Sequence, residues 1–403
     1  MRITDFTAKG VLTVAITLFL GSRVGWCGKP DNLDYLTLSL DELKQIEVVT
    51  ADRMPESIAN TSASIILILQ DEIQQSGART IFDLLQHIPG IIVGVGNFGE
   101  NYVALRGVHT LYSEKVLFML NGHVLNDARS GSATYQFLDH LPVKNIKQIE
   151  IVLGPGSALY GANAFSGVIN ILTRQAEQVA GIEADVNFER GSSGNIAGRY
   201  NVFYGQRSKN DWGTSLNINY VKKPGNELAV ASDVLGRSGY AATQEQLSDV
   251  QAVLEKGEFQ IQGRYMKRRA GDYFGALHVL NDQSNQEVEF AFLDMNYHAQ
   301  LTSAVDITTS VYVNYQETAN FYVGYPAGSI PPDNPYYAWN SDGLKGETLA
   351  KELLPGMEVR VDYTALEQHA LTLGMAYRHE RLYDVGFKAN YNPNYLPDVE
   401  DVK

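Results

Sequence analysis

The second half of the chain repeats a pattern of alternating apolar and polar residues. In residues 182–188, for example, the sequence IEADVNF alternates without a break. The same alternation returns at residues 305–315, 357–364 and 371–377. A period of two places successive side chains on opposite faces of a strand. The pattern therefore predicts a series of β-strands from about residue 179, each with one apolar and one polar face.

The lengths of these segments and of their connections favour a membrane barrel. The predicted strands run roughly 9–15 residues, which lets a tilted strand cross a bilayer. Short connections are expected near residues 207–211, 255–257, 301–304 and 366–368, and long ones near 224–246, 269–286 and 318–347. Short turns on one side and long loops on the other are typical of outer-membrane barrels. A soluble β-sandwich, whose strands also alternate, is the alternative interpretation.

The region from about residue 36 to 175 has a different pattern and is expected to be an α+β domain. Buried strands are predicted at 65–69, 102–105, 116–120, 146–152 and 168–172, and short helices from Asp71 to before Gly77 and at 81–87. Thr80 and Asp83 form a capping box for the second helix, which Pro89 ends. Asn121-Gly122 is typical of a type I′ hairpin turn.

A glycine-rich segment, residues 154–171, closes this first region. Such a density of glycine predicts close backbone approach and unusual dihedral angles. The segment has no Gly-Lys-Ser/Thr sequence, so it is not a phosphate-binding loop. Residues 94–99 match G-x-G-x-x-G, but a strand pattern follows them where a dinucleotide site needs a helix. The glycines are therefore read as structural.

Charge and the N-terminus narrow the function further. The net charge is -14, which argues against a nucleic-acid partner. Arg2 and Lys9 precede the apolar run Val11–Leu20, and this arrangement predicts a signal peptide at residues 1–28. The only cysteine, Cys27, lies at that boundary, so no structural disulfide is expected. The sequence contains no run of 18 apolar residues, so a membrane form would have to be a closed β-barrel.

Several short motifs occur in the order found in a known family. They lie at residues 47–51, 83–85, 89–90, 105–107, 120–122, 149–151, 154–164 and 167–171. As a series they resemble the plug of TonB-dependent outer-membrane receptors. The motif residues that we single out as structural are Arg106, Gly107, Asn121, Gly122, Gly154, Pro155, Gly156, Tyr160, Gly161, Asn163, Gly167 and Asn170.

The resemblance implies a fold class and a domain order. The expected fold is an α+β plug domain followed by an antiparallel transmembrane β-barrel in the outer membrane of a Gram-negative bacterium. The expected segments are a signal peptide at 1–28, an N-terminal segment at 29–64, the plug at 65–175 and a partial barrel at 179–403. Receptors of this kind close with about 22 strands, and the pattern predicts about nine here. We therefore expect the chain to be truncated.

The resemblance also implies a partner and a role for the N-terminal segment. Residues 46–51 form a β-prone stretch that could pair with the sheet edge of another protein, although a plain strand of the first domain is equally compatible. The proposed TonB-coupling segment is Ile46, Glu47, Val48, Val49, Thr50 and Ala51. The implied partners are TonB with the inner-membrane energy-transducing complex, outer-membrane lipid, and an iron chelate or another large ligand. Arg106 could pair with an acidic residue of the barrel and lock the plug.

Ligand contacts are expected in the glycine-rich and aromatic loops, because aromatic rings can stack on planar ligands. The candidates are Asn97, Phe98, Tyr102, Tyr112, Arg129, Tyr135, Tyr325 and Trp339. A packing role for these aromatic residues is equally compatible. The implied function is uptake of a ferric siderophore, with cobalamin, haem or a saccharide as alternatives and a passive barrel as a third class. No catalytic nucleophile, resident cofactor or metal site is expected.

Overall fold

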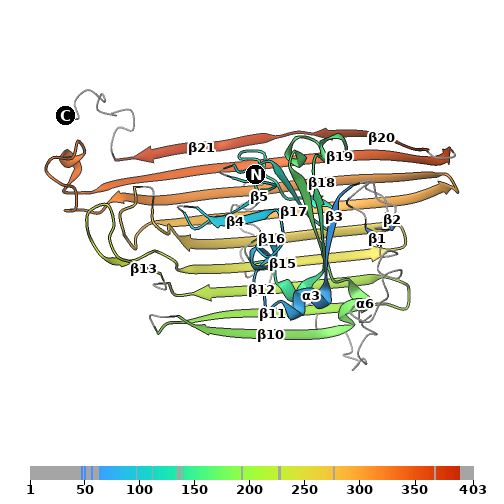
Figure 1. The fold of residues 1–403 in the computed structure, drawn as a ribbon, viewed down its shortest axis with the longest axis horizontal. Helices are drawn as coiled ribbons and strands as arrows, with labels where there is room; N and C mark the ends of the chain where they lie inside the picture. Colours follow the sequence, from blue (N-terminus) through green and yellow to red (C-terminus); the bar gives the residue numbers. More distant parts are fainter. Residues whose placement is uncertain are drawn as a thin grey trace, which may run out of the picture.

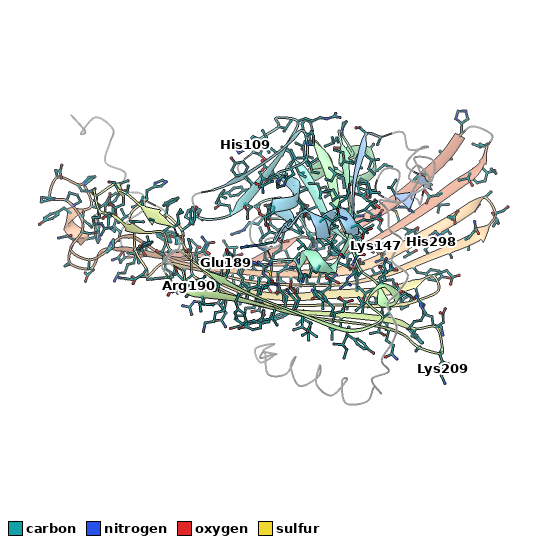
Figure 2. The ribbon with its side chains drawn as sticks, turned by 60° about the horizontal axis from the view of Figure 1, so that its bottom comes forward. His109, Lys147, Glu189, Arg190, Lys209 and His298 are labelled. Carbon is teal, nitrogen blue, oxygen red and sulfur yellow. The ribbon has the colours of Figure 1, made fainter. Side chains whose placement is uncertain are left out.

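The computed structural model describes residues 47–48, 50, 56–57, 63–96, 98–110, 112–133, 138, 140–191, 194–225, 228–275, 277–366 and 369–390. The predicted signal peptide lies outside them. Two parts follow one another along the chain. We call the described residues up to Val179 the plug, and the large sheet formed by the later strands the wall. Figure 2 shows the wall as a curved sheet with the plug on its concave side.

A mixed sheet of five strands forms the centre of the plug. Its strands are β3 (Ile65–Leu69), β8 (Ile146–Leu153), β9 (Gly167–Thr173), β6 (Val116–Leu120) and β7 (His123–Val124), in this spatial order. β6 and β9 run parallel, and the other neighbours are antiparallel. The central strands have apolar side chains on the face that packs in the core, where Ile149, Ile151 and Ile169 are fully buried. These strands agree with the sequence pattern.

Short helices and hairpins surround this sheet. They are β1 (Glu47–Val48), β2 (Glu56–Ser57), α3 (Gln70–Gln75), α4 (Ile81–Leu85), β4 (Ile91–Val95), β5 (Asn101–Leu105), η2 (Val143–Asn145), α5 (Ser157–Tyr160), η3 (Ala162–Ala164) and α6 (Ala176–Val179). The Thr80 hydroxyl accepts the Asp83 N–H at 3.1 Å, and the Asp83 carboxylate accepts the Thr80 N–H at 2.9 Å. This capping box begins α4 as expected. The helix ends at Leu85, shorter than the predicted 81–87.

Long antiparallel strands form the wall (Figure 1). They are β10 (Gly181–Arg190), β11 (Ile196–Arg207), β12 (Gly213–Lys223), β15 (Glu245–Lys256), β16 (Phe259–Gly271), β17 (Asn285–Thr302), β18 (Val305–Tyr325), β19 (Leu344–Leu366), β20 (His369–Arg378) and β21 (Arg381–Ala389). β20 and β21 pair with different parts of β19, so the described residues occupy nine strand positions. This number agrees with the sequence pattern.

The connections of the wall alternate as predicted, but three strands are longer than expected. β17, β18 and β19 contain 18, 21 and 23 residues. The loop expected at 318–347 is therefore confined to about 326–343, and it contains η4 (Tyr337–Trp339). Charged side chains lie on the outer face there, as in the 3.3 Å pair of Glu317 with Lys351, because a strand that extends beyond lipid needs no apolar outer face. The short strands β13 (Ala229–Val230) and β14 (Gly239–Tyr240) lie in another long connection.

The two faces of the wall differ in the sense expected for a membrane barrel. On β17, Phe290, Phe292 and Asp294 are buried toward the plug, whereas Leu293 and Met295 are 44% and 39% exposed on the other face. Buried polar residues on the inner face of the wall include Asn217, Asn219, Asp249, Gln251, Gln262, Arg264, Gln286, Glu352 and Asp362. A soluble sandwich buries its apolar face instead. Among the described residues, no helix is long and apolar enough to cross a membrane.

Candidate functional site

The glycine-rich segment packs tightly at one end of the plug sheet. A Cβ at Gly167 would lie 2.4 Å from the Val152 carbonyl oxygen, and one at Gly156 would lie 3.1 Å from Val168. Gly154 and Gly161 have φ angles of 134° and 83°, which L-residues rarely adopt. The segment also lines a groove of about 290 Å³ that includes Pro155, Tyr160 and Thr50. The glycines therefore serve close approach of the backbone, as the sequence suggested.

Two asparagines of the motif form hydrogen bonds with segments that are distant in the sequence. The Asn163 Nδ2 donates to the carbonyl oxygens of Glu114 and Gly131, each at 3.1 Å. The Asn121 Oδ1 accepts the Thr173 N–H at 2.8 Å. Asn121 and Gly122 have φ angles of 49° and 83°, which is the geometry of the type I′ turn predicted from the sequence.

Arg106 and Gly107 also have positive φ angles, of 50° and 80°. The Arg106 N–H donates to the Gly90 carbonyl at 2.8 Å, so the backbone of this motif closes a turn beside the β4–β5 hairpin. Its guanidinium is exposed, and it forms no ion pair with any described residue. The expected lock between Arg106 and a barrel carboxylate is therefore not seen in this part of the chain.

The predicted coupling segment is only partly described. Ile46, Val49 and Ala51 lie outside the described residues. Glu47 and Val48 form β1, which pairs with β2 through Glu47↔Ser57 and Val48↔Glu56. Val48 and Thr50 are each only 1% exposed. Thr50 contacts Glu150, Asn170 and Tyr160, which lie on three different elements of the plug.

A row of acidic residues on β10 faces cations of the plug. Arg174 makes a bidentate pair with Glu183 at 3.0 and 2.8 Å, and Lys144 pairs with Asp185. Arg79 contacts Glu189 at 2.7 Å, with both side chains more than half exposed. Figure 2 shows Glu189 and Arg190 on the wall beside the plug. The alternation of β10 was visible in the sequence, but the plug cations have no sequence pattern.

Buried pairs join the plug to the strands farther along the wall. The His140 Nε2 lies 2.7 Å from the Glu245 Oε1, and the Arg268 Nε and Lys223 Nζ contact the same carboxylate at 2.5 and 2.9 Å. His123 stacks on Phe292 with ring centroids 4.0 Å apart, and its Nδ1 lies 3.4 Å from Asp294. Sequence reasoning missed these contacts, because they join single residues that no motif contains.

One wall carboxylate holds a loop that carries a candidate ligand residue. The Ala128 N–H donates to the two Glu352 oxygens at 3.0 and 3.2 Å. Arg129 follows directly and is exposed. A carboxylate that accepts a backbone N–H fixes the local backbone, so Glu352 positions the loop while the Arg129 side chain stays accessible.

Two of the plug candidates for ligand contact, Phe98 and Tyr102, lie on the β4–β5 hairpin. Phe98 is at its tip, and its carbonyl accepts from the Gln286 Nε2 at 3.5 Å. Tyr102 belongs to β5, in agreement with the strand predicted at 102–105, and its ring meets His109 edge-on with centroids 4.7 Å apart. Tyr112 is 39% exposed. Asn97 and Tyr135 lie outside the described residues.

The wall candidates lie apart from these plug residues. Tyr325 ends β18 instead of lying in a loop, and its hydroxyl accepts from the Asn334 Nδ2 at 3.2 Å. Trp339 lies in η4, with its ring 6.1 Å from that of Tyr336. Within the described ranges, no hydrogen bond, ion pair or ring contact joins Tyr325 or Trp339 to the plug. The structure thus separates the candidates into a plug group and a loop group.

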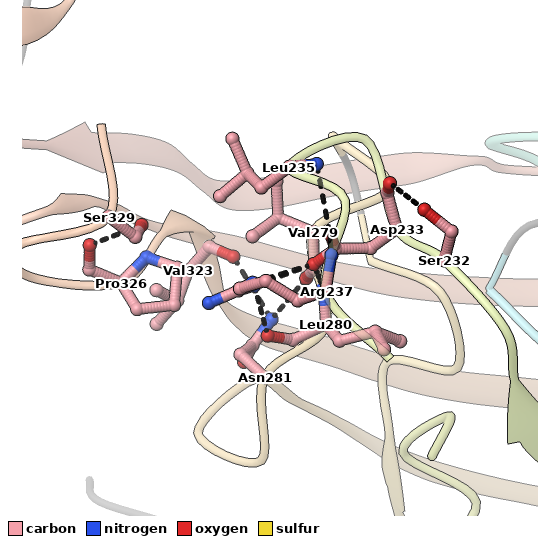
Figure 3. A network of polar contacts seen from close by, with 10 residues as sticks. All are labelled: Ser232, Asp233, Leu235, Arg237, Val279, Leu280, Asn281, Val323, Pro326 and Ser329. Carbon is pink, nitrogen blue, oxygen red and sulfur yellow. Dashed lines mark hydrogen bonds and ion pairs between the residues drawn. The ribbon is translucent and has the colours of Figure 1, made fainter. Parts of the chain in front are cut away.

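An ion pair within one long loop of the wall, with a buried carboxylate, also bonds the backbone of the next long loop (Figure 3). Arg237 donates to the Asp233 Oδ2 from Nε at 2.9 Å and from Nη2 at 2.7 Å. The same Nη2 donates to the Leu280 carbonyl in the next long loop at 2.9 Å. Burial alone would raise the pKa of Asp233, but the Arg237 guanidinium and three backbone N–H groups outweigh burial and hold that pKa below its usual value. Among the described residues, no group of three or more His, Cys, Asp or Glu side chains could hold a metal ion.

Comparison with known proteins matches both parts of the chain. The sequence model of the TonB-dependent Receptor Plug Domain family matches residues 57–168. The vitamin B12 transporter BtuB of Vibrio vulnificus (strain CMCP6) is 34% identical over 149 residues, which are 37% of this chain and 24% of that protein. The BtuB of Photobacterium profundum is 34% identical over 160 residues, which are 38% and 25% of the two chains.

Two solved structures share the fold of plug and wall. The ferric yersiniabactin uptake receptor FyuA from Yersinia pestis has a TM-score of 0.57 at 16% identity, over 84% of this chain and 50% of FyuA. The ferric citrate transporter FecA in its unliganded form has a TM-score of 0.61 at 17% identity, over 81% and 49% of the two chains. The chain thus spans about a quarter of the curated relatives and about half of the solved structures that it matches. Residues 57–168 thus match the TonB-dependent receptor plug family, and the chain shares the plug-and-wall fold of the receptors FyuA and FecA.

Proposed function

We propose that the chain acts in an outer-membrane receptor that binds a large, scarce metal chelate and imports it into the periplasm with energy from the inner membrane. The observation that carries this proposal is the plug docked on the inner face of the wall through buried polar contacts, such as His140 with Glu245. A passive pore needs no domain that fills its lumen. Transport through a filled lumen requires the plug to move or rearrange, and this movement needs an external source of energy.

The proposed energy source is TonB with its inner-membrane complex. The coupling segment would reach TonB from the periplasmic end of the plug and pair with it as an added strand. Among the described residues β1 pairs with β2, and such a partner would add to the other edge of β1. The apolar outer face of the wall, with residues such as Leu293 and Met295, would contact outer-membrane lipid. An enzymatic role is not proposed, because the related proteins are named as receptors and transporters.

The ligand class rests on two kinds of support. Ferric siderophores are our first candidate, and the fold neighbours FyuA and FecA are named for ferric chelates, although likeness at this identity concerns fold alone. Cobalamin is the second candidate, because the relatives that match by sequence are named vitamin B12 transporters. Both ligands are large metal chelates. Haem and saccharides remain further alternatives in the same architecture.

Uptake measurements in the host organism test this proposal. The gene is deleted, and uptake of labelled cobalamin, a ferric catecholate, a ferric hydroxamate and haem is compared with uptake in the parent strain. We expect one of these ligands to lose its energy-dependent uptake, and a protonophore to abolish the same uptake in the parent. Unchanged uptake and growth on all of them, and on defined carbohydrates, would contradict the proposed function.

A further inference from the structure

A buried carboxylate of the plug sheet contacts the coupling segment. Glu150 lies in β8, is fully buried, and points away from the core face on which Ile149 and Ile151 pack. Its cross-strand partner is Asn170 of β9. A buried carboxylate is costly unless hydrogen bonds replace its hydration. Glu150 therefore needs hydrogen-bond donors within the plug.

Thr50 supplies two of these hydrogen bonds. Its backbone N–H and its hydroxyl both donate to the Glu150 Oε2, at 2.9 and 2.5 Å. The Gln148 Nε2 donates to the Oε1 at 2.7 Å. Hydrogen bonds to an ionised acceptor are about twice as strong as neutral ones. Glu150 is thus a strong point of attachment for one residue of a segment that lies 100 positions away in the sequence.

The remaining polar groups of Thr50 are also bound by the plug. The Asn170 Nδ2 donates to the Thr50 hydroxyl oxygen at 3.0 Å, and the Tyr160 hydroxyl donates to the Thr50 carbonyl at 3.0 Å. The hydroxyl therefore both donates and accepts, which uses the two capacities of a threonine side chain. Valine has the same shape but can do neither. Serine can do both.

We propose that Glu150, with Asn170 and Tyr160, is the catch that retains the coupling segment in the plug, and that release of Thr50 from this catch controls how far the segment is exposed. The proposal rests on the coupling role given to residues 46–51 under the proposed function. Glu150 and its neighbours act here as positioning residues, because none of them needs to contact a transported ligand. The glycine-rich motif then has a second role, since its residues Tyr160 and Asn170 hold Thr50.

Thiol labelling of the full chain without TonB tests the catch directly. Cys27→Ser removes the natural cysteine, and Val48→Cys places a probe at a position that is 1% exposed. The rate of reaction with a membrane-impermeant maleimide then reports exposure of the segment. We expect Thr50→Val to raise this rate about tenfold, the change that follows from losing one charge-assisted hydrogen bond. Glu150→Ala removes both hydrogen bonds from Thr50 and should raise the rate by at least as much. Tyr160→Phe should raise it about threefold, because it removes a neutral bond.

Two variants control for packing and for general loss of plug structure. Thr50→Ser keeps the hydroxyl and should label at the parent rate. Glu100→Gln changes another buried plug carboxylate, one that accepts the Phe98 N–H at 2.9 Å, and should also leave the rate unchanged. If Thr50→Val labels no faster than the parent, or no faster than Thr50→Ser, the catch is overturned. Since Thr50→Val alters only the terminal segment, this result does not depend on whether Glu150→Ala folds.

A second measurement, the binding of TonB, distinguishes failure of the catch from failure of the proposed function. Glu150→Ala and Tyr160→Phe leave the coupling segment intact, so they can be titrated with the purified periplasmic domain of TonB. Faster labelling together with tighter TonB binding supports both proposals. Faster labelling with no TonB binding to any variant supports the catch and contradicts the coupling role. TonB binding that is equal for the parent and the variants, with unchanged labelling, overturns the catch while the coupling role stands.

Discussion

The ion pair between Asp249 of β15 and Arg264 of β16 offers a sharp test of how the wall is stabilised. The two side chains are 1% and 0% exposed, and they meet in bidentate fashion at 2.9 and 3.0 Å. Removing one partner of such a pair leaves a buried charge without compensation, which typically costs about 3–5 kcal/mol. We therefore expect Asp249→Ala and Arg264→Ala each to lower the free energy of unfolding by about 3 kcal/mol or more.

The same wall supplies a matched control. Lys267, also on β16, contacts Glu287 of β17 at 2.8 Å, but the side chains are 48% and 38% exposed. Solvent screens such a pair, and its contribution is about 0.2–1 kcal/mol. Lys267→Ala should therefore cost several times less than Asp249→Ala. Both pairs join a cation of β16 to a carboxylate of a neighbouring strand, and they differ mainly in burial.

Unfolding by urea in detergent micelles, followed by tryptophan fluorescence, measures these differences. The double variant Asp249→Ala with Arg264→Ala should cost clearly less than the sum of the single variants, because it removes both charges together. A coupling energy of about 2 kcal/mol or more is expected. If Asp249→Ala costs no more than Lys267→Ala, or if the single effects simply add, the pair is not desolvated and our account of the inner face of the wall is wrong.

Three further predictions follow from local geometry. Asp233 has a pKa below its ordinary value of 3.8, so its contribution to the loop contact in Figure 3 is complete above that pH and is lost as the pH falls through the lowered pKa; proteolysis of residues 231–238 should accelerate there, and Asp233→Asn should remove the pH dependence. Gly167→Ala should destabilise the plug by roughly 3 kcal/mol, because its Cβ would lie 2.4 Å from the Val152 carbonyl, whereas Gly161→Ala has open space and should cost only about 1–2 kcal/mol for its positive φ; equal melting temperatures for the two variants would contradict this. Gly356→Ala places a Cβ 2.3 Å from the Tyr312 ring, whereas Gly374→Ala meets only an ordinary 3.9 Å contact, so the first should lower the melting temperature clearly more than the second.

The sequence predicted those elements whose residues repeat with a regular period or whose turn chemistry is local. β6 and the turn at Asn121-Gly122 have the predicted bounds because an apolar run and two residues suited to positive φ specify them without reference to the rest of the chain. The alternation of the wall strands is equally local. The predicted outer ends of these strands are wrong, because strand pairing continues beyond the apolar outer-face residues. Tyr325, which was expected in a loop, therefore belongs to β18.

The candidate site depends on pairs that no local pattern specifies. Thr50 was singled out within its segment, but nothing in the sequence relates it to Glu150, which lies 100 residues later. The acids of β10 were visible as the polar half of an alternating strand, yet Arg79 and Lys144 lie in separate plug elements. Such contacts result from how the plug docks on the wall, and docking is fixed by summed shape and burial more than by any one motif.

The contacts of the plug with β10, at one edge of the wall, differ in strength from its contacts with the strands farther along the wall. This difference bears on how the plug could move. On β10, the Arg79–Glu189 pair is more than half exposed, and such pairs contribute about 0–1 kcal/mol each. Farther along the wall, the plug residue His140 contacts the buried Glu245 carboxylate at 2.7 Å, and plug residues share an apolar cluster with Met266 and Phe290. Breaking a buried polar contact and exposing apolar side chains costs more than separating one exposed ion pair. A cavity of about 940 Å³ lies on the β10 side, lined by Arg79, Lys144 and Glu189 among others. By these magnitudes the plug is held most weakly where Arg79 meets Glu189, whereas the Arg174–Glu183 pair and the contacts at β12 to β17 hold it more firmly.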